Sequence, residues 1–270
     1  MMPRGSVAFG LLLLLVIVAV AGQGFWTSDP FAQDPAARLL DPSAAHPLGT
    51  DNFGRDLLAR LVLGARWSLT GAALVCVGTS LLGFVIGAAA ATGNAVTDTL
   101  IGRTIEALMA MPGLVLALAL SAILGPSFEN LIIALILTGW PGYARLSRSL
   151  ILKERHQAYV DSAIALGAGR TRIIGRHILP NVLGPAVILA TSDFGKVILG
   201  LASLSFLGLG MQPPTPEWGA MINEARGYFQ SHPWQMAAPG LCIVMTVLLV
   251  NLTGDGLRDA LDPRRLRRHA

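Results

Sequence analysis

Residues 67–97 read WSLTGAALVCVGTSLLGFVIGAAAATGNAVT and contain no Asp, Glu, Lys or Arg. About 20 consecutive apolar residues are enough for an α-helix to cross the hydrocarbon core of a bilayer. The stretch therefore predicts a transmembrane helix over about 67–91. Two further stretches, 107–128 and 227–254, also lack charged residues. The sequence is thus predicted to belong to a polytopic membrane protein.

The composition agrees with this prediction. Of the 270 residues, 53% are hydrophobic and 13% are charged, and the mean hydropathy is +0.60. An ordinary soluble domain carries roughly 25% charged residues. A pI of about 9.6 can indicate nucleic-acid binding, but in a membrane protein it indicates basic residues on the cytoplasmic side. Cys76 and Cys242 lie in apolar stretches and predict packing residues, not a disulfide or a metal site.

The apolar stretches predict six transmembrane helices, so both ends of the chain should lie on one side of the membrane. The spans are expected at about 7–26, 67–91, 103–124, 130–150, 182–206 and 235–253. A basic residue before the first stretch and the residues AVA at 19–21 also fit a cleavable signal peptide, and this alternative stays open. Within the second span, Gly83, Gly87 and Ala91 recur every fourth residue, which predicts close helix packing.

The positions of the basic residues predict the orientation, because cytoplasmic segments of membrane proteins are enriched in Lys and Arg. With both termini inside, the cytoplasmic segments hold Arg4, Arg103, the cluster from Arg145 to Arg176 and the tail from Arg258 to Arg268. The outside segments hold fewer, namely Arg38, Arg55, Arg60, Arg66 and Arg226. We therefore expect a single membrane domain over 1–270. Its first span (7–26) is followed by an external segment with an amphipathic helix (27–66), then by a five-helix core (67–254) and a basic cytoplasmic tail (255–270). The tail is expected to bind anionic lipid headgroups.

This topology places a polar stretch, residues 159–181 (YVDSAIALGAGRTRIIGRHILPN), in the cytoplasm between the fourth and fifth spans. We call it the polar loop. Val160, Ala163 and Ile164 share one face of a short predicted helix. Gly167 and Gly169 then permit a sharp bend.

A second short helix, RTRIIGRHIL, is expected after the bend, and Pro180 should end it. Two short helices at an angle would project into the cytoplasm. An amphipathic segment that rests on the headgroups is the alternative from composition alone.

The polar loop resembles the EAA loop of ABC importer permeases, the cytoplasmic element that inserts into a groove on the ATP-binding subunit. The matching residues are Asp161, Ser162, Ala163, Gly167, Leu179 and Pro180. The loop departs from the family pattern in having Asp for Glu, Ser for the first Ala, and His177 in place of an aliphatic residue. The resemblance implies that the ATPase contact is made by Tyr159, Asp161, Ser162, Ala163, Gly167, Ala168, Arg172, Leu179 and Pro180.

Three more stretches carry the resemblance over nearly the whole chain: HPLGTDNFGRDLLARLVLGARWSL (46–69), LSFLGLGMQPPTPEWGAMI (204–222) and NLTGDGLRDALDPR (251–264). They are similar to the second, C-type permease of the dipeptide, oligopeptide and nickel importers. The resemblance implies an all-α integral membrane protein of the inner membrane, with six spans and both termini in the cytoplasm. It also implies a second, homologous permease, two ATP-binding subunits and an extracytoplasmic substrate-binding protein as partners. The implied cargo is di- or oligopeptides, with a nickel chelate as the alternative.

Several chemical motifs are absent from the sequence. It has no Gly-x-x-x-x-Gly-Lys-Ser/Thr phosphate loop, and its lysines are Lys153 and Lys196. It has no His-Glu-x-x-His and no Gly-x-Ser-x-Gly. We therefore expect no enzyme activity, no metal site and no cofactor bound by this chain, with ATP and Mg²⁺ bound by partner subunits. A self-sufficient secondary transporter would be expected to need internal repeats, broken helices or a membrane carboxylate relay, and the sequence shows one mid-membrane carboxylate and no evident repeat.

Two groups of residues outside the polar loop are candidates for function. Asp193 and Lys196 lie near the middle of the fifth span, three residues apart. They either line the translocation path or form a self-compensating pair packed against another helix. At the external side, Trp218, Arg226 and Trp234 either contact a substrate-delivery protein or belong to an interfacial aromatic belt.

Overall fold

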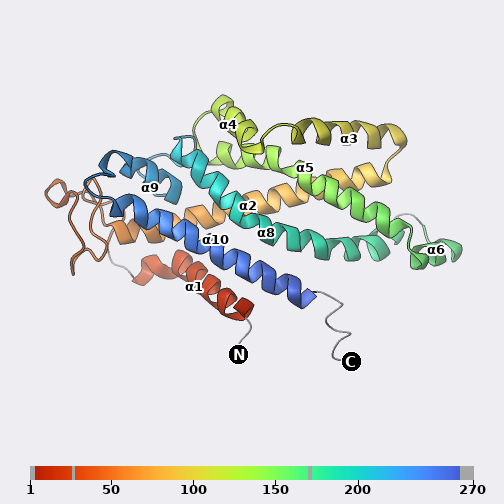
Figure 1. The fold of residues 1–270 in the computed structure, drawn as a ribbon, viewed down its shortest axis with the longest axis horizontal. Helices are drawn as coiled ribbons and strands as arrows, with labels where there is room; N and C mark the ends of the chain where they lie inside the picture. Colours follow the sequence, from red (N-terminus) through yellow and green to blue (C-terminus); the bar gives the residue numbers. More distant parts are fainter. Residues whose placement is uncertain (1–3, 26–27, 170–171, 262–270) are drawn as a thin grey trace.

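The computed structural model describes residues 4–25, 28–169 and 172–261 (Figure 1). These residues form helices joined by loops, and no β-strand occurs among them. The helices are α1 (Arg4–Phe25), α2 (Leu57–Thr92), α3 (Ala95–Met109), α4 (Gly113–Leu124), α5 (Phe128–Arg155), α6 (Ala158–Ala165), α8 (Leu179–Phe206), α9 (Trp218–Ala225) and α10 (Trp234–Leu261), with short turns η1 (Pro35–Ala37), η2 (Ile173–Ile178) and η3 (Arg226–Tyr228). The all-α class predicted from the sequence is confirmed for this part of the chain.

The long helices lie side by side along the molecule (Figure 1). α2 packs most extensively on α5, α8 packs on both α2 and α10, and α1 runs along α10 and α2. The segment 28–56 and α9 lie at one end, which we call the α9 end, and α6 lies at the opposite end, the α6 end. α1 begins and α10 ends on the side that faces the α6 end. The described ends of the chain are therefore on the same side as the polar loop.

Three helical stretches are long and apolar enough to cross a membrane: α2, residues Ile173–Phe206 and residues Trp234–Gly256. α3 and α4 together make a fourth candidate, but they meet at an angle of 92°. The prediction of one continuous span over 103–124 is therefore wrong. Pro112 precedes the first residue of α4, and proline disfavours helical backbone in the residue before it.

The remaining two predicted spans are helical, but neither is counted among the helices that are long and apolar enough to cross a membrane. The fourth expected span lies in α5, which carries Arg145 and Arg148 in its second half. The first lies in α1, whose described apolar stretch is Phe9–Gly22. The count of six spans is thus not established by length and composition.

Small residues allow α2 and α5 to pack closely. A Cβ on Gly83 would lie 2.5 Å from the carbonyl oxygen of Trp140, and one on Gly87 would collide with Ser147 and Ala144. The hydroxyl of Ser147 donates to the Ala144 carbonyl at 3.2 Å. The close packing predicted from the glycine spacing is confirmed, since only glycine leaves room for backbones at this separation.

The segment before the second predicted span differs from the prediction. No separate amphipathic helix forms, because α2 begins at Leu57 and continues for 36 residues to Thr92. Asp56 caps it, and its Oδ1 accepts a hydrogen bond from the Ala59 amide at 2.8 Å. Arg55 and Arg60, which are among the basic residues predicted for the outside segments, are only 2% and 1% exposed. They are buried because the 28–56 segment and α9 cover the start of α2.

Both arginines are held in a buried ionic cluster. Arg55 contacts Asp51 (Nε to Oδ2, 2.6 Å) and Glu224 (Nη2 to Oε2, 2.6 Å). Arg60 contacts the same two acids at 3.2 Å and 3.0 Å. Two cations and two carboxylates balance in charge, which is how buried charges are tolerated. The cluster joins the 28–56 segment and the start of α2 to α9.

The fifth predicted span is longer than expected. Ile173–Phe206 is one helical run, so the prediction of a second short helix that ends at Pro180 is wrong. Pro180 lies in the first turn of α8, where the missing amide proton costs little. The π-helical turn η2 (Ile173–Ile178) directly precedes α8. The helix therefore extends from the membrane region into the polar loop without a break.

Candidate functional site

The polar loop begins where α5 ends at Arg155 and α6 starts at Ala158. α6 ends in a pair of hydrogen bonds in which the Gly167 amide donates to the Ile164 carbonyl (2.9 Å) and the Ala168 amide to the Ala163 carbonyl (3.0 Å). This is the Schellman arrangement, which needs a left-handed residue after the last turn. Gly167 supplies it with a φ of +81°. The predicted bend is confirmed at Gly167, whereas Gly169 has no left-handed backbone and does not form it.

The inner face of α6 rests on the helices around it. Val160 is 1% exposed and packs in a cluster with Ala91 of α2, Ile151 of α5, and Ile178 and Val182 at the start of the long helix. Ala163 is only half-buried and Ile164 is exposed. Of the apolar face predicted for α6, Val160 is therefore the residue that anchors the helix.

A polar network fixes the same region. The Tyr159 hydroxyl donates to the Glu154 carboxylate of α5 at 2.5 Å. The Asn181 side-chain amide of α8 donates to the Tyr159 hydroxyl at 2.9 Å and to the His177 carbonyl at 3.0 Å. Partial desolvation and the hydrogen bond to the Glu154 carboxylate raise the pKa of Tyr159. Tyr159 thereby joins α5, α6 and α8.

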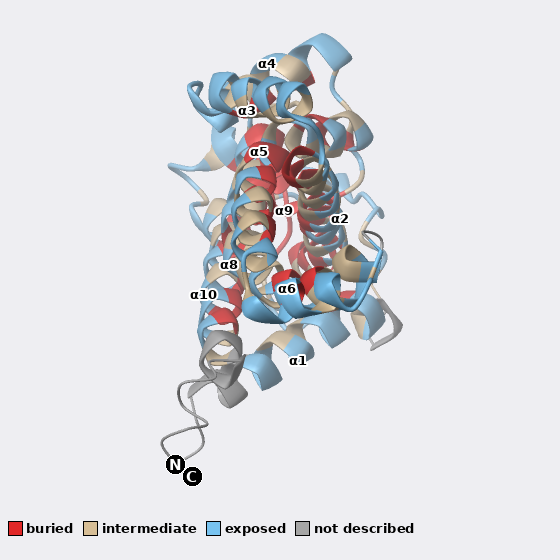
Figure 2. Cartoon of the chain, turned by 90° about the vertical axis from the view of Figure 1, so that its right-hand side faces the viewer, coloured by how far each residue is buried: buried red, intermediate tan, exposed pale blue. Residues whose placement is uncertain are grey.

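The outer face of α6 exposes large apolar side chains. Ile164 is 55% exposed and Leu166 is 88% exposed, the largest fraction among the described large hydrophobic residues. Figure 2 shows α6 facing out of the α6 end, mostly in the colour of exposed residues. Leu166 is not among the residues that the resemblance implied. Leu166 lies one residue before Gly167 in the sequence, and this position is the signal that could have identified it as a contact residue.

The other predicted contact residues lie on the same projection. Asp161, Ser162, Gly167, Arg172 and Pro180 are exposed, whereas Ala163, Ala168 and Leu179 are half-buried. A hollow of about 410 Å³ opens beside α6, lined by residues such as Arg155, Ile164 and Ile174. The projection therefore presents apolar side chains, a carboxylate and a hollow together.

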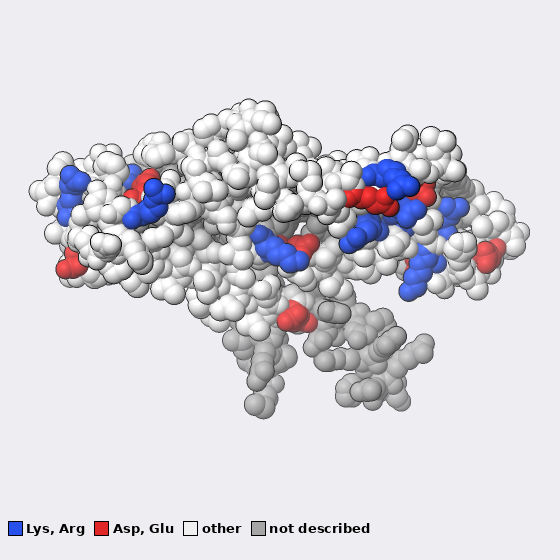
Figure 3. Space-filling view, turned by 45° about the horizontal axis from the view of Figure 1, so that its top comes forward, with Lys and Arg blue, Asp and Glu red and all other residues white. Residues whose placement is uncertain are grey.

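Asp193 and Lys196 form the predicted pair on one face of α8. Their Nζ and Oδ1 atoms are 2.7 Å apart, and the side chains are 80% (Lys196) and 20% (Asp193) exposed. The alternative of a pair packed against another helix of this chain does not hold for Lys196. Figure 3 shows a largely uncharged surface between charged groups at the two ends of the molecule, interrupted near the centre by one blue-and-red patch and a further red group below it. A cation exposed within a membrane span requires water or another protein to face it.

The three predicted binding-protein contacts, Trp218, Arg226 and Trp234, differ in their exposure. Trp218 is 1% exposed, and its indole Nε1 donates to the Leu61 carbonyl at 3.1 Å, so it is not available at the surface and its prediction as a contact residue is wrong. Arg226 is exposed, and Trp234 is 41% exposed. Glu217, the residue before Trp218, helps to hold Trp218 in its buried position. Its side chain caps α9, and it accepts a hydrogen bond from the Ser68 hydroxyl at 2.7 Å. Among the described residues, no group of three or more His, Cys, Asp or Glu could hold a metal ion.

The chain is similar in sequence to known proteins. Residues 83–267 match the family model of the binding-protein-dependent transport system inner membrane component. The chain is 42% identical over 94% of its length to the dipeptide transport system permease protein DppC of Alkalihalophilus pseudofirmus, of which it covers 84%. It is 40% identical over 99% of its length to the nickel transport system permease protein NikC of Escherichia coli, of which it covers 97%.

A solved structure shares the fold. In an inward-facing conformation of the MetNI methionine ABC transporter, one chain aligns with a TM-score of 0.60 over 76% of this chain and 98% of its own length, at 17% identity. At this identity the similarity concerns the fold alone. The family match and the two close relatives show that the chain belongs to the family of inner-membrane components of binding-protein-dependent transport systems.

Proposed function

We propose that this chain is the permease subunit of an ATP-driven importer and transmits force from partner ATPases through its polar loop. The observation that carries the proposal is the exposure of Leu166 and Ile164 on a helix that Val160 and Tyr159 hold against α5 and α8. Exposed apolar side chains on a fixed projection are typical of a protein interface. The polar loop then acts as the coupling loop in the cytoplasm.

The orientation follows from this role. We propose six spans, α1, α2, the bent α3–α4 pair, α5, α8 and α10, with both termini in the cytoplasm. The described ends of α1 and α10 lie toward the α6 end, and the basic cluster from Arg145 to Arg176 surrounds the polar loop. Both features support a cytoplasmic α6 end.

The continuity of the helix at Pro180 suggests how force is transmitted. A continuous helical run from Ile173 to Phe206 would pass a displacement of α6 on to α8. Closure of a partner ATPase pair would move α6, and α8 would tilt with it as a packed unit. No phosphate loop occurs in the sequence, so ATP and Mg²⁺ are assigned to two partner subunits, and the chain itself binds no cofactor.

Replacing Tyr159 with phenylalanine should reduce ATP-driven uptake several-fold while the chain remains assembled. The change removes a hydrogen bond to a carboxylate, worth about 1.5–3 kcal/mol, and leaves the Asn181 amide without one acceptor. α6 would then move partly independently of α5 and α8. The readout is the number of cargo molecules carried per ATP hydrolysed. Tyr228→Phe, at the α9 end, is the matched control, and equal ratios for both variants would contradict the coupling role.

The cargo is proposed to be di- or oligopeptides, because DppC is named a dipeptide permease. A nickel chelate is the alternative, since NikC is named a nickel permease and is nearly as similar. Delivery by an extracytoplasmic binding protein is part of the proposal, with Arg226 and Trp234 at the α9 end as candidate contacts. Uptake of labelled dipeptide compared with chelated nickel by the same complex distinguishes the two cargoes.

Lys196 and Asp193 are proposed to face the translocation path, shared with a homologous permease. Lys196→Met should lower the rate of uptake several-fold without loss of the complex, because the change removes an exposed cation from a membrane span. Asp193 is left without its partner in this variant, so Asp193→Asn/Lys196→Met serves as the charge-balanced control. Unchanged uptake by both assembled variants would remove the path assignment.

Reconstitution tests the proposed function as a whole. The chain with a second permease and two ATPases should import cargo only when the binding protein and ATP are present. The chain alone in proteoliposomes should show no uptake under an ion gradient. Gradient-driven uptake by the chain alone would instead establish a secondary transporter.

A further inference from the structure

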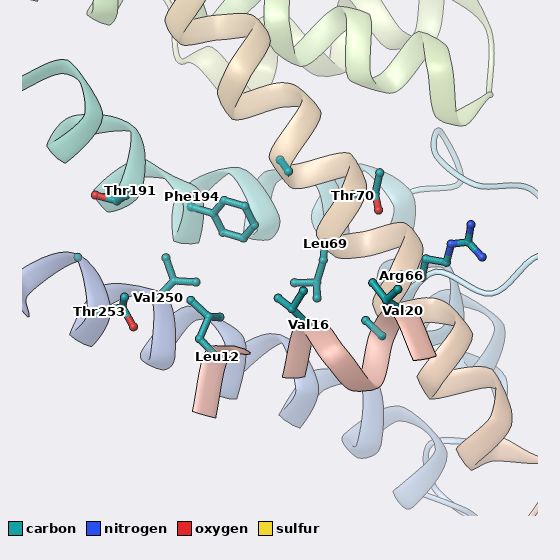
Figure 4. A pocket seen from close by; sticks show the side chains of 13 residues that line it. Leu12, Val16, Val20, Arg66, Leu69, Thr70, Thr191, Phe194, Val250 and Thr253 are labelled. Atoms are coloured by element: carbon teal, nitrogen blue, oxygen red, sulfur yellow. The ribbon is translucent and has the colours of Figure 1, made fainter. Parts of the chain in front are cut away.

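A cavity of about 440 Å³ lies among the membrane helices, separate from the polar loop (Figure 4). Side chains of four helices line it: Leu12 and Val16 of α1, Leu69 of α2, Phe194 of α8 and Val250 of α10. Neither Asp193 nor Lys196 is among the lining residues. The cavity thus lies apart from the charged face of α8.

The walls of the cavity offer little to a polar ligand. The hydroxyl of Thr191 donates to the Ile188 carbonyl at 2.9 Å, and that of Thr253 donates to the Leu249 carbonyl at 2.7 Å. Both hydroxyls are therefore satisfied within their own helices. Cavities with apolar walls exclude water and accept apolar ligands. An aliphatic chain fits these walls.

One end of the cavity carries a positive charge. Figure 4 shows Thr191 and Thr253 at one end and Arg66 at the other, with the guanidinium group of Arg66 extending beyond Val20. Arg66 is exposed, and its side chain makes no ion pair or hydrogen bond with the described part of the chain. A guanidinium group binds phosphate oxygens by charge-assisted hydrogen bonds. The cavity therefore combines an apolar slot with an anion-binding mouth.

The dimensions fit one leaflet of a bilayer. From Leu12 to Val20 the cavity follows eight residues of α1, which is about 12 Å along a helix. Half of a hydrocarbon core of about 30 Å is about 15 Å. Arg66 lies just before the charge-free stretch 67–97, at the depth where headgroups begin.

We propose that this cavity is a phospholipid-binding site, in which one acyl chain lies between α1, α2, α8 and α10 and the lipid phosphate binds Arg66. The lipid belongs to the leaflet at the α9 end. It fills the space between α1 and α8 and so joins the first helix to the core. The proposal requires only that the chain lies in a membrane, and it does not depend on the cargo or on the coupling role.

Native mass spectrometry of the purified complex tests the site. Phosphatidylglycerol should remain bound to the wild-type complex, and Arg66→Gln should weaken its retention roughly tenfold, since a charged hydrogen bond is lost. Arg226→Gln removes an exposed arginine at the same end outside the cavity and should leave retention unchanged. Diacylglycerol, which lacks the phosphate, should be retained no better by the wild type than by Arg66→Gln. Inorganic phosphate alone should not bind.

A second variant tests the acyl-chain slot separately. Ala73 lines the cavity and is exposed, so Ala73→Leu should fill part of the slot without disturbing the fold and should also reduce retention of phosphatidylglycerol. Equal retention by wild type, Arg66→Gln and Ala73→Leu would overturn the proposal. A photo-reactive residue at position 73 that cross-links to the second permease, and not to lipid, would also overturn it by showing a protein interface.

Discussion

Replacing Gly167 with valine should abolish ATP-driven uptake while the chain still inserts and assembles. Gly167 has a φ of +81°, and a left-handed conformation costs an ordinary residue about 1–2 kcal/mol, more if it is β-branched. The two hydrogen bonds that end α6 depend on this conformation. Their loss would let Leu166 leave its position at the tip of the projection. Uptake in proteoliposomes and the amount of chain in the purified complex are the two measurements.

Gly169 provides a matched control in the same loop. It is exposed, it has no left-handed backbone, and a Cβ placed on it would meet no atom within 4 Å. Gly169→Val adds the same side chain two residues away and should keep most of the uptake. A Gly167→Val complex that transports at the wild-type rate would contradict the coupling role of the bend. Loss of uptake in both variants would mean that the effect comes from bulk and not from the backbone.

Replacing Arg60 with methionine should destabilise the α9 end by about 3–5 kcal/mol, because it leaves a buried carboxylate without full compensation. Arg60 is 1% exposed and contacts both Asp51 and Glu224. The neutral cluster would become net negative, with Arg55 as its one remaining cation among the four residues. A loss of this size is a large fraction of the stability of a folded protein. Thermal melting of the purified complex measures it.

Two comparisons identify the cause of the loss. Arg226→Met removes an exposed arginine at the same end and should leave the melting temperature unchanged. The double variant Arg60→Met/Glu224→Gln removes one charge of each sign, so it should be less destabilised than Arg60→Met alone. A single Arg60→Met variant that melts at the wild-type temperature would show that the cluster contributes little.

The polar loop shows how far local sequence rules reach. The bend at Gly167 follows from a local rule, since few other residues adopt a positive φ at little cost. The exposure of Leu166 does not follow from any periodicity. It depends on Val160 filling a site formed by α2, α5 and α8, and these contacts come from distant parts of the chain. Pro180 was ambiguous for a different reason, because proline can either follow the end of one helix or lie in the first turn of the next.

The sequence by itself determined the membrane class, the all-α fold, the close packing at Gly83 and Gly87 and the glycine bend, because each depends on hydropathy or on backbone geometry within one helix. Only the tertiary structure decided which polar residues are buried. Arg55, Arg60 and Trp218 have the composition of an exposed segment, yet the packing of 28–56 and α9 over the start of α2 encloses them. Burial of a charge depends on partners that are more than 150 residues away in the chain. Such pairing is a property of the folded chain, and no local pattern records it.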